Sequence, residues 1–100
     1  MYNRIVADET QFDWDDANVK HIAGHNVSPE EAEQVVLNDP VDIDYQRADN
    51  EERYLVVGVT MKARFLTLLW TERRNAVRVI TAFDSSREDE EAYWHQKRTS

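Results

Sequence analysis

Two of the three histidines in this 100-residue chain, His21 and His25, lie four positions apart. Residues at this spacing are neighbours on the surface of a helix, and imidazole is the side chain whose ordinary pKa lies nearest to neutrality. The pair is therefore suited to proton transfer, to metal binding or to the recognition of an acidic partner. A purely structural interpretation is a histidine at a helix end that packs on Trp14 and bonds a nearby acid.

A metal site is the least favoured of these interpretations. No glutamate follows His21 as it would in a His-Glu-x-x-His zinc motif, and the sequence offers no evident third ligand. The chain also lacks cysteine, which removes thiolate ligands, thiolate nucleophiles and disulfides and fits a reducing compartment. We therefore predict no metal, no other cofactor and a cytoplasmic location.

Cations in the strand-like part of the chain form a second group of candidates. They are Arg53, Arg64 and Arg78. On neighbouring strands these side chains would make a phosphate-binding cluster. The alternative is a set of salt bridges across the sheet. The acids available for such bridges are Glu51, Glu52 and Glu72. Arg78 is the most informative candidate, because a cation between two valines in mid-strand must snorkel, pair or bind a ligand.

Charge and hydropathy limit the classes of partner. Twenty acids against twelve bases give a formal net charge of −8, and the field of such a molecule repels polyanions in general. Nucleic-acid binding would then need a local basic patch. No apolar run approaches the ~20 residues of a membrane-spanning helix, and the first residues lack the apolar core of a signal peptide. We expect a soluble protein with no membrane partner.

Local signals predict helices at both ends of the chain and strands between them. Residues 15–24 are typical of a helix with Asp15 or Asp16 near its N-cap and Gly24 at its C-terminal end. A capping box from Ser28 to Glu31, with proline at the first helical position, starts a second helix that ends at residues 38–40. Strand-like runs follow at residues 53–60, 63–71 and 76–83, with an alternating edge strand at 41–45 and a last helix at 88–97.

These elements predict a single α+β domain over residues 1–100 in the order (β)ααββββα, where the first strand is optional. Short connections imply an antiparallel sheet of three to five strands. Two N-terminal helices and one C-terminal helix would gather mainly on one face of this small sheet. The opposite face is then free to carry a site.

Two further features have competing interpretations. Core packing is preferred over the stacking of nucleic-acid bases for Trp14 and Trp70, whereas Trp94 near the C-terminus also fits a docking surface or an interface. The acidic run at residues 88–91 fits a solvated helix start that the helix dipole favours. Its alternative is a docking surface for a basic partner.

Motifs spread from Phe12 to Tyr93 carry a resemblance to a known family. The N-terminal ones are Phe12-Asp13-Trp14-Asp15, Asn18 with His21 and His25, Val27-Ser28-Pro29-Glu30-Glu31-Ala32, and Asn38-Asp39-Pro40. The C-terminal ones are Glu52-Arg53 to Gly58, Ala63-Arg64-Phe65-Leu66, Val77-Arg78-Val79-Ile80-Thr81-Ala82, and Tyr93. In their order and spacing these motifs resemble the BrnT family of bacterial toxins from type II toxin–antitoxin modules.

The resemblance implies a RelE-like fold, a metal-independent ribonuclease activity on RNA and a small cognate antitoxin that covers the toxin. In metal-free cleavage a base activates the ribose 2′-hydroxyl, cations stabilise the phosphorane and an acid protonates the leaving 5′-oxygen. The matching positions for proton transfer are Lys20, His21 and His25. The matching positions for phosphate are Arg53, Arg64 and Arg78, and we assign Arg78 to the catalytic group.

The chain departs from the family pattern near its C-terminus. Relatives commonly carry Ala-Arg at the end of the last strand and several basic residues on the terminal helix. This chain has Ala82-Phe83-Asp84 there, followed by the acids of residues 88–91. Each lost phosphate contact removes a counterion-release contribution to binding. The alternative function is therefore a non-enzymatic member that keeps the scaffold as a protein-binding module, self-associating as a homodimer through a sheet edge or the terminal helix.

Overall fold

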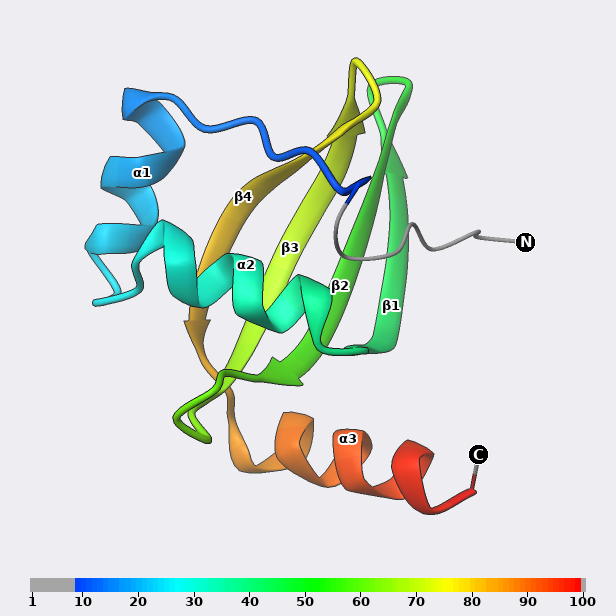
Figure 1. Cartoon of the computed structure of the whole chain (residues 1–100). Coiled ribbons are helices and arrows are strands. Elements are labelled where there is room, and N and C mark those ends of the chain that lie inside the picture. Colours follow the sequence, from blue (N-terminus) through cyan, green and yellow to red (C-terminus); the bar gives the residue numbers. More distant parts are fainter. Residues whose placement is uncertain (1–8, 100) are drawn as a thin grey trace.

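The computed structural model describes residues 9–99, which form three helices and one four-stranded antiparallel sheet (Figure 1). The helices are α1 (Asp16–Ala23), α2 (Pro29–Leu37) and α3 (Arg87–Thr99). The strands lie in chain order across the sheet: β1 (Val41–Ala48), β2 (Glu51–Val59), β3 (Phe65–Arg73) and β4 (Ala76–Asp84). The predicted α+β class is confirmed. The optional first strand falls in part on residues 1–8, which lie outside the described residues.

The two N-terminal helices begin at side-chain caps. Asp15 accepts hydrogen bonds from the backbone N–H groups of Ala17 and Asn18, and the Asn18 side chain accepts one from the backbone N–H of Asp15. Ser28 and Glu31 form the predicted capping box at the start of α2. Such reciprocal bonds satisfy amide groups that have no partner within the first helical turn. Sequence signals therefore fix both helix starts.

Two-residue turns close the outer hairpins. Asp49 and Asn50 connect β1 to β2, Arg74 and Asn75 connect β3 to β4, and all four residues have positive φ values between 53° and 64°. Consecutive left-handed residues of this kind match the twist of the flanking strands. As a result β1 continues to residue 48, whereas the prediction ended the edge strand at residue 45. The polar strand ends next to these turns were indistinguishable from loop by composition.

The sheet separates two packed layers. Successive strand residues point to opposite faces, so Val56 packs toward α1 and α2 while Val57 packs with Tyr93 of α3. The larger core, on the first face, includes Ile22, Val27, Ala32, Val35, Leu66, Leu68, Trp70, Val79 and Ala82. On the second face α3 lies across one end of the sheet (Figure 1). The face predicted to be free is therefore covered by α3 at that end.

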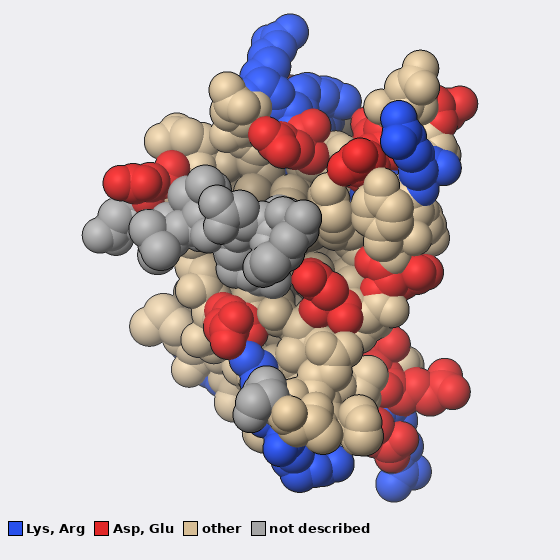
Figure 2. All heavy atoms as spheres, turned by 90° about the vertical axis from the view of Figure 1, so that its right-hand side faces the viewer, with Lys and Arg blue, Asp and Glu red and all other residues tan. Residues whose placement is uncertain are grey.

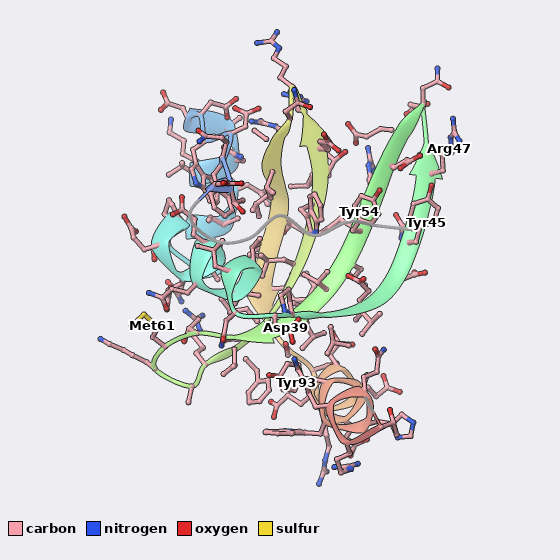
Figure 3. All side chains as sticks on the ribbon, turned by 45° about the vertical axis from the view of Figure 1, so that its right-hand side comes forward. Asp39, Tyr45, Arg47, Tyr54, Met61 and Tyr93 are labelled. Carbon is pink, nitrogen blue, oxygen red and sulfur yellow. The ribbon has the colours of Figure 1, made fainter. Side chains whose placement is uncertain are left out.

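Aromatic side chains pack against the larger core. Tyr45 and Tyr54 lie side by side on β1 and β2 with their ring centroids 5.5 Å apart (Figure 3), and Tyr54 stacks on Trp70 at 4.7 Å. Trp70 is 5 % exposed and Trp14 packs against the same core, so the expected core role of both is confirmed. Trp94, in contrast, stays half exposed on α3.

Gly58 permits the close crossing of α2 over β2. A Cβ atom at this position would lie 2.8 Å from Cγ1 of Val35 and 3.1 Å from Cβ of Pro40. Atoms do not approach so closely without displacement, because protein interiors are already close-packed. The absence of a side chain at residue 58 thus sets the distance between the helix layer and the sheet.

Candidate functional site

An open groove of about 410 Å³ lies on the second face, at the junction of α1 with the sheet. Its lining residues are Ala17, Asn18, His21, Glu51, Arg53, Thr71, Arg73, Arg78, Val79 and Ile80. Arg53 is the register partner of Thr71, and Thr71 is the partner of Arg78. Directly paired residues share a face of the sheet. The strand register therefore brings Arg53 and Arg78 into one groove, as the phosphate-cluster hypothesis requires.

Arg78 is the most buried cation of the groove, with a side chain that is 13 % exposed. Its Nη2 lies 3.1 Å from Oδ2 and 3.2 Å from Oδ1 of Asp15, and its Nη1 lies 3.6 Å from Oδ2 of Asp13. The hydrogen bond from Arg78 is the largest cause that lowers the pKa of the Asp15 carboxyl. Both acids come from the segment before and at the start of α1, so α1 docking orients the guanidinium.

The other two groove arginines also face carboxylates. Arg53 donates from Nε to Glu51, 2.7 Å away and two residues earlier on the same strand. Arg73 Nη1 lies 4.0 Å from Oδ2 of Asp13. Of the acids predicted as partners, only Glu51 is used in this way, and its bridge runs along the strand. The alternative of a salt bridge to Glu51 is thus observed for Arg53, but it runs along the strand and not across the sheet.

The two histidines are neighbours but differ in position. His21 lines the groove, and its Nε2 lies 3.0 Å from Oγ1 of Thr81 in a hydrogen bond. His25 follows the end of α1 and is not among the lining residues; its ring lies 5.8 Å from that of His21 and 6.0 Å from that of Phe83. Lys20 is exposed and does not line the groove.

The structural interpretation of the histidine pair needs correction. Trp14 packs against the core and donates from Nε1 to Glu33 at 2.8 Å, so it is engaged elsewhere. The partner of His21 is the hydroxyl of Thr81 and not an acid. A hydroxyl partner can accept or donate a hydrogen bond as the imidazole requires. The ring of His21 is thereby oriented by a neutral partner.

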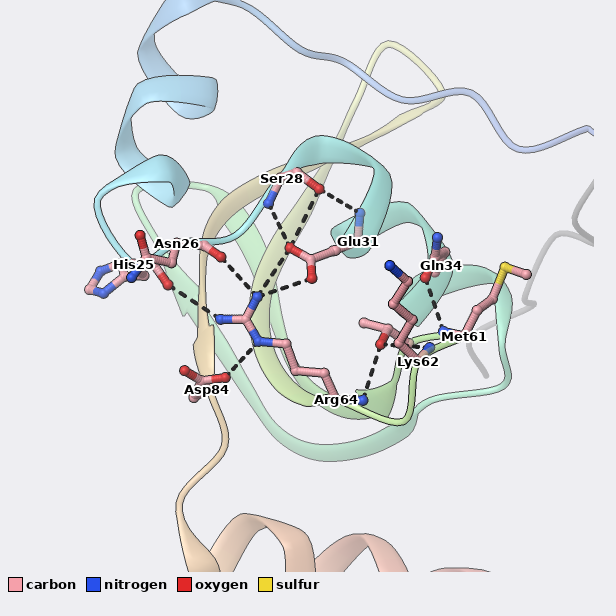
Figure 4. A network of polar contacts seen from close by, with 10 residues as sticks. His25, Asn26, Ser28, Glu31, Gln34, Met61, Lys62, Arg64 and Asp84 are labelled. Atoms are coloured by element: carbon pink, nitrogen blue, oxygen red, sulfur yellow. Dashed lines mark hydrogen bonds and ion pairs between the residues drawn. The ribbon is translucent and has the colours of Figure 1, made fainter.

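Arg64 lies outside the groove, in a network of its own (Figure 4). Its Nε donates to Asp84 at 2.8 Å, and its Nη1 donates to both carboxylate oxygens of Glu31 at 3.1 Å and to the carbonyl of Asn26 at 2.8 Å. Its Nη2 donates to the carbonyl of His25 at 3.5 Å. The structure does not bring Arg64 together with Arg53 and Arg78, and the bridges predicted for it are replaced by these contacts.

Two residues that help to build the site, Arg73 and Asn18, are not among the predicted site residues. Arg73 follows the predicted end of its strand; extending that strand by two residues would have placed it on the face of Thr71. Asn18 is 4 % exposed, and its Nδ2 donates to the carbonyls of Asp13 at 3.0 Å and Val79 at 3.1 Å. It fastens α1 to the edge of β4. A polar residue on the apolar side of a short helix was the available signal.

The face of the molecule on the β1 side carries mixed charges (Figure 2). On the β1 side of the molecule, Lys and Arg side chains stand mainly at the top and bottom of the view and Asp and Glu side chains spread between them (Figure 2). Polyanion binding needs several cations on one surface, and the groove supplies them from β2, β3 and β4. Within residues 9–99 no group of three His, Asp or Glu side chains is placed to hold a metal ion.

Fold and site together define a small α+β domain with an arginine-lined groove beside an imidazole. This chain belongs to the BrnT family, because residues 14–89 match the family model described as "Ribonuclease toxin, BrnT, of type II toxin-antitoxin system". The predicted resemblance is thus confirmed, and the family implies a cognate antitoxin as partner. No curated protein matches the chain. No helix within the described residues is long and apolar enough to cross a membrane.

Proposed function

We propose that this chain is an endoribonuclease that cleaves RNA in the groove without a metal ion, and that its cognate antitoxin neutralises it. One observation carries the proposal: Arg53 and Arg78 meet His21 at a single open groove, although they come from different elements. Metal-free cleavage of RNA needs a proton-transfer group next to cations that stabilise the phosphorane. These are the groups that line the groove.

The placement of the candidates supports some roles more than others. His21 is the preferred proton-transfer group, since it lines the groove and is oriented by Thr81. His25 supports it through a ring contact, and exposed Lys20 is the least favoured of the proton-transfer candidates. Arg78 and Arg53 would bind phosphate. We withdraw that role from Arg64, whose donors are occupied by two acids and by two backbone carbonyls.

A cleavage assay tests the proposal. Purified protein is incubated with single-stranded RNA in excess EDTA, and the rate is compared with His21→Ala and Arg78→Met. We expect cleavage by the wild type and a loss of about 100-fold in each variant, the usual cost of removing a transition-state donor or a proton-transfer group. Matched controls are His95→Ala and Arg87→Met, which change exposed residues of α3 and should leave the rate unchanged.

A second candidate function is the non-enzymatic protein-binding module. The observation in its favour is that Arg53, Arg73 and Arg78 already face carboxylates, which offsets the charge that RNA would meet. RNA left intact by the wild type would contradict the enzymatic proposal and favour this module. In cells, expression without the antitoxin should arrest growth under the first function and have no effect under the second. Light scattering of the purified chain tests whether it self-associates as a homodimer.

A further inference from the structure

We propose that Asp15 competes with substrate phosphate for Arg78 and so sets how tightly the groove binds RNA. The inference rests on the proposed function, because it assigns a role to a carboxylate at the same groove. Asp15 does not itself line the groove, and the sequence alone gives no reason to connect it with Arg78, which is 63 positions away. The contacts that Asp15 makes carry the argument.

Asp15 occupies a complete set of anion-binding donors. Its Oδ1 accepts from the backbone N–H groups of Ala17 at 3.0 Å and Asn18 at 3.1 Å, both in the first turn of α1. Both carboxylate oxygens also lie within 3.2 Å of Nη2 of Arg78. Backbone amides at a helix start together with a guanidinium are a combination that binds phosphate oxygens in proteins. Here a carboxylate of the chain itself already fills that position.

Contacts with the backbone hold the competing carboxylate in place. The segment before α1 is fixed to β4, because Val77 donates to the carbonyl of Gln11 and Asp13 donates to the carbonyl of Val77, each at 2.8 Å. The Asn18 side chain then donates from Nδ2 to the carbonyl of Asp13 and accepts at Oδ1 from the backbone N–H of Asp15. None of these bonds depends on the charge of Asp15. The charge is therefore separable from the local structure.

Exposure favours competition over a purely structural pair. The Arg78 side chain is 13 % exposed and the Asp15 side chain is 52 % exposed. A phosphate that reaches the guanidinium must share it with this carboxylate or displace it. The ordinary pKa of the Asp15 carboxyl is 3.8 and Arg78 lowers it further, so the charge is present at neutral pH and so is the competition. Asp13 adds a second, more distant carboxylate at 3.6 Å from the same guanidinium.

The substitution Asp15→Asn separates the two properties of the residue. Asparagine caps helices as well as aspartate does and can accept the same amide bonds, but it carries no charge. Asp16→Asn is the matched control, since it removes the same charge from the next residue, an exposed one that begins α1. If Asp15→Asn does not fold, Asp15→Ser supplies another neutral cap. Thermal unfolding of each variant confirms that the fold is kept.

Binding of a fluorescein-labelled single-stranded RNA, followed by fluorescence anisotropy at several salt concentrations, provides the test. We expect Asp15→Asn to bind about three- to ten-fold more tightly and its salt dependence to steepen by about one phosphate contact. Asp16→Asn should change affinity less than about two-fold. In an Arg78→Met background the extra effect of Asp15→Asn should vanish, because a coupling between two residues disappears when one is removed.

Binding that is no tighter in Asp15→Asn than in Asp16→Asn would overturn the inference. A weaker binding would do the same and would show that Asp15 positions Arg78 instead. Equal tightening with and without Arg78 would also overturn it. The cleavage assay in EDTA reports separately on the proposed function. A chain that cleaves no RNA but still gains affinity on Asp15→Asn would refute the ribonuclease and leave the competition standing.

Discussion

Arg64 and Arg78 both pair with two acids, yet their surroundings assign them to different tasks. Arg64 adds the carbonyls of His25 and Asn26 to its acidic partners, so its donors tie the α1–α2 connection to the start of β3. Arg78 lies beside an open groove with a half-exposed carboxylate in front of it. Pairing with acids therefore does not separate structural from functional arginines. Arg64 donates to two backbone carbonyls and lies outside the groove, whereas Arg78 donates to one, that of Asp13 at 3.4 Å, and lines the groove.

The largest expected difference between the two arginines is in stability. Arg64→Met should lower the free energy of unfolding by about 2 kcal/mol, because it removes the charge-assisted hydrogen bonds to Glu31 and Asp84. Arg78→Met should lower the free energy of unfolding by less, while it reduces RNA cleavage by about 100-fold. Urea denaturation followed by circular dichroism measures both, with Arg87→Met on the exposed face of α3 as control. Equal losses of unfolding free energy in Arg64→Met and Arg78→Met would contradict the structural role assigned to Arg64.

A smaller effect is expected in the pH dependence of the Arg64 network. The backbone N–H of Ser28, and then Arg64, lower the pKa of Glu31 from its ordinary 4.5, and Arg64 lowers that of Asp84 from 3.8. A depressed folded-state pKa contributes stability that is complete above the unfolded value and is lost as the pH falls through the folded value. Wild type should thus lose stability below about pH 4.5 more steeply than Glu31→Gln.

Urea midpoints measured from about pH 7 down to about pH 3 check this sign. Glutamine keeps the capping box but not the charge, so the stability advantage of the wild type should shrink toward low pH. The matched control is Glu30→Gln, which changes an exposed acid in the same helical turn. A constant gap between wild type and Glu31→Gln at all pH values would contradict the expected linkage.

The smallest expected effect concerns the orientation of His21. Thr81→Val removes the hydroxyl that bonds its Nε2 and keeps the shape of the side chain. We expect the rate of RNA cleavage to fall about three- to ten-fold and the free energy of unfolding to fall by about 0.5–1 kcal/mol. Thr81→Ser, which keeps the hydroxyl, should restore the rate. A loss as large as that of His21→Ala would place Thr81 in the catalytic machinery itself.

The sequence predicts which helices and strands form more accurately than it predicts the residues at which they end. The caps at Asp15 and Ser28 and the apolar alternation of the strands are local features, and the predicted helices and sheet follow from them. The turns at residues 49–50 and 74–75 were missed because polar strand ends resemble loops until they pair across the sheet. Arg73 was left out of the site for that reason.

The candidate site was predicted in part. His21, Arg53 and Arg78 line one groove. The other candidates, His25, Arg64 and Lys20, do not. No local pattern distinguishes these residues, since an arginine in a strand has the same chemistry whether its face is open or closed. Only the register that pairs Arg53 with Thr71 and Thr71 with Arg78 decides which cations meet.

By itself the sequence determined the starts of the two N-terminal helices, the order of helices and strands, the overall negative charge and the family. These properties depend on residue types and short spacings, which the chain carries before it folds. Only the tertiary structure decided which carboxylate faces which guanidinium. Arg78 meets the carboxylates of Asp15 and Asp13, 63 and 65 positions away. Such contacts are set by the register of the sheet and the docking of α1 on its edge.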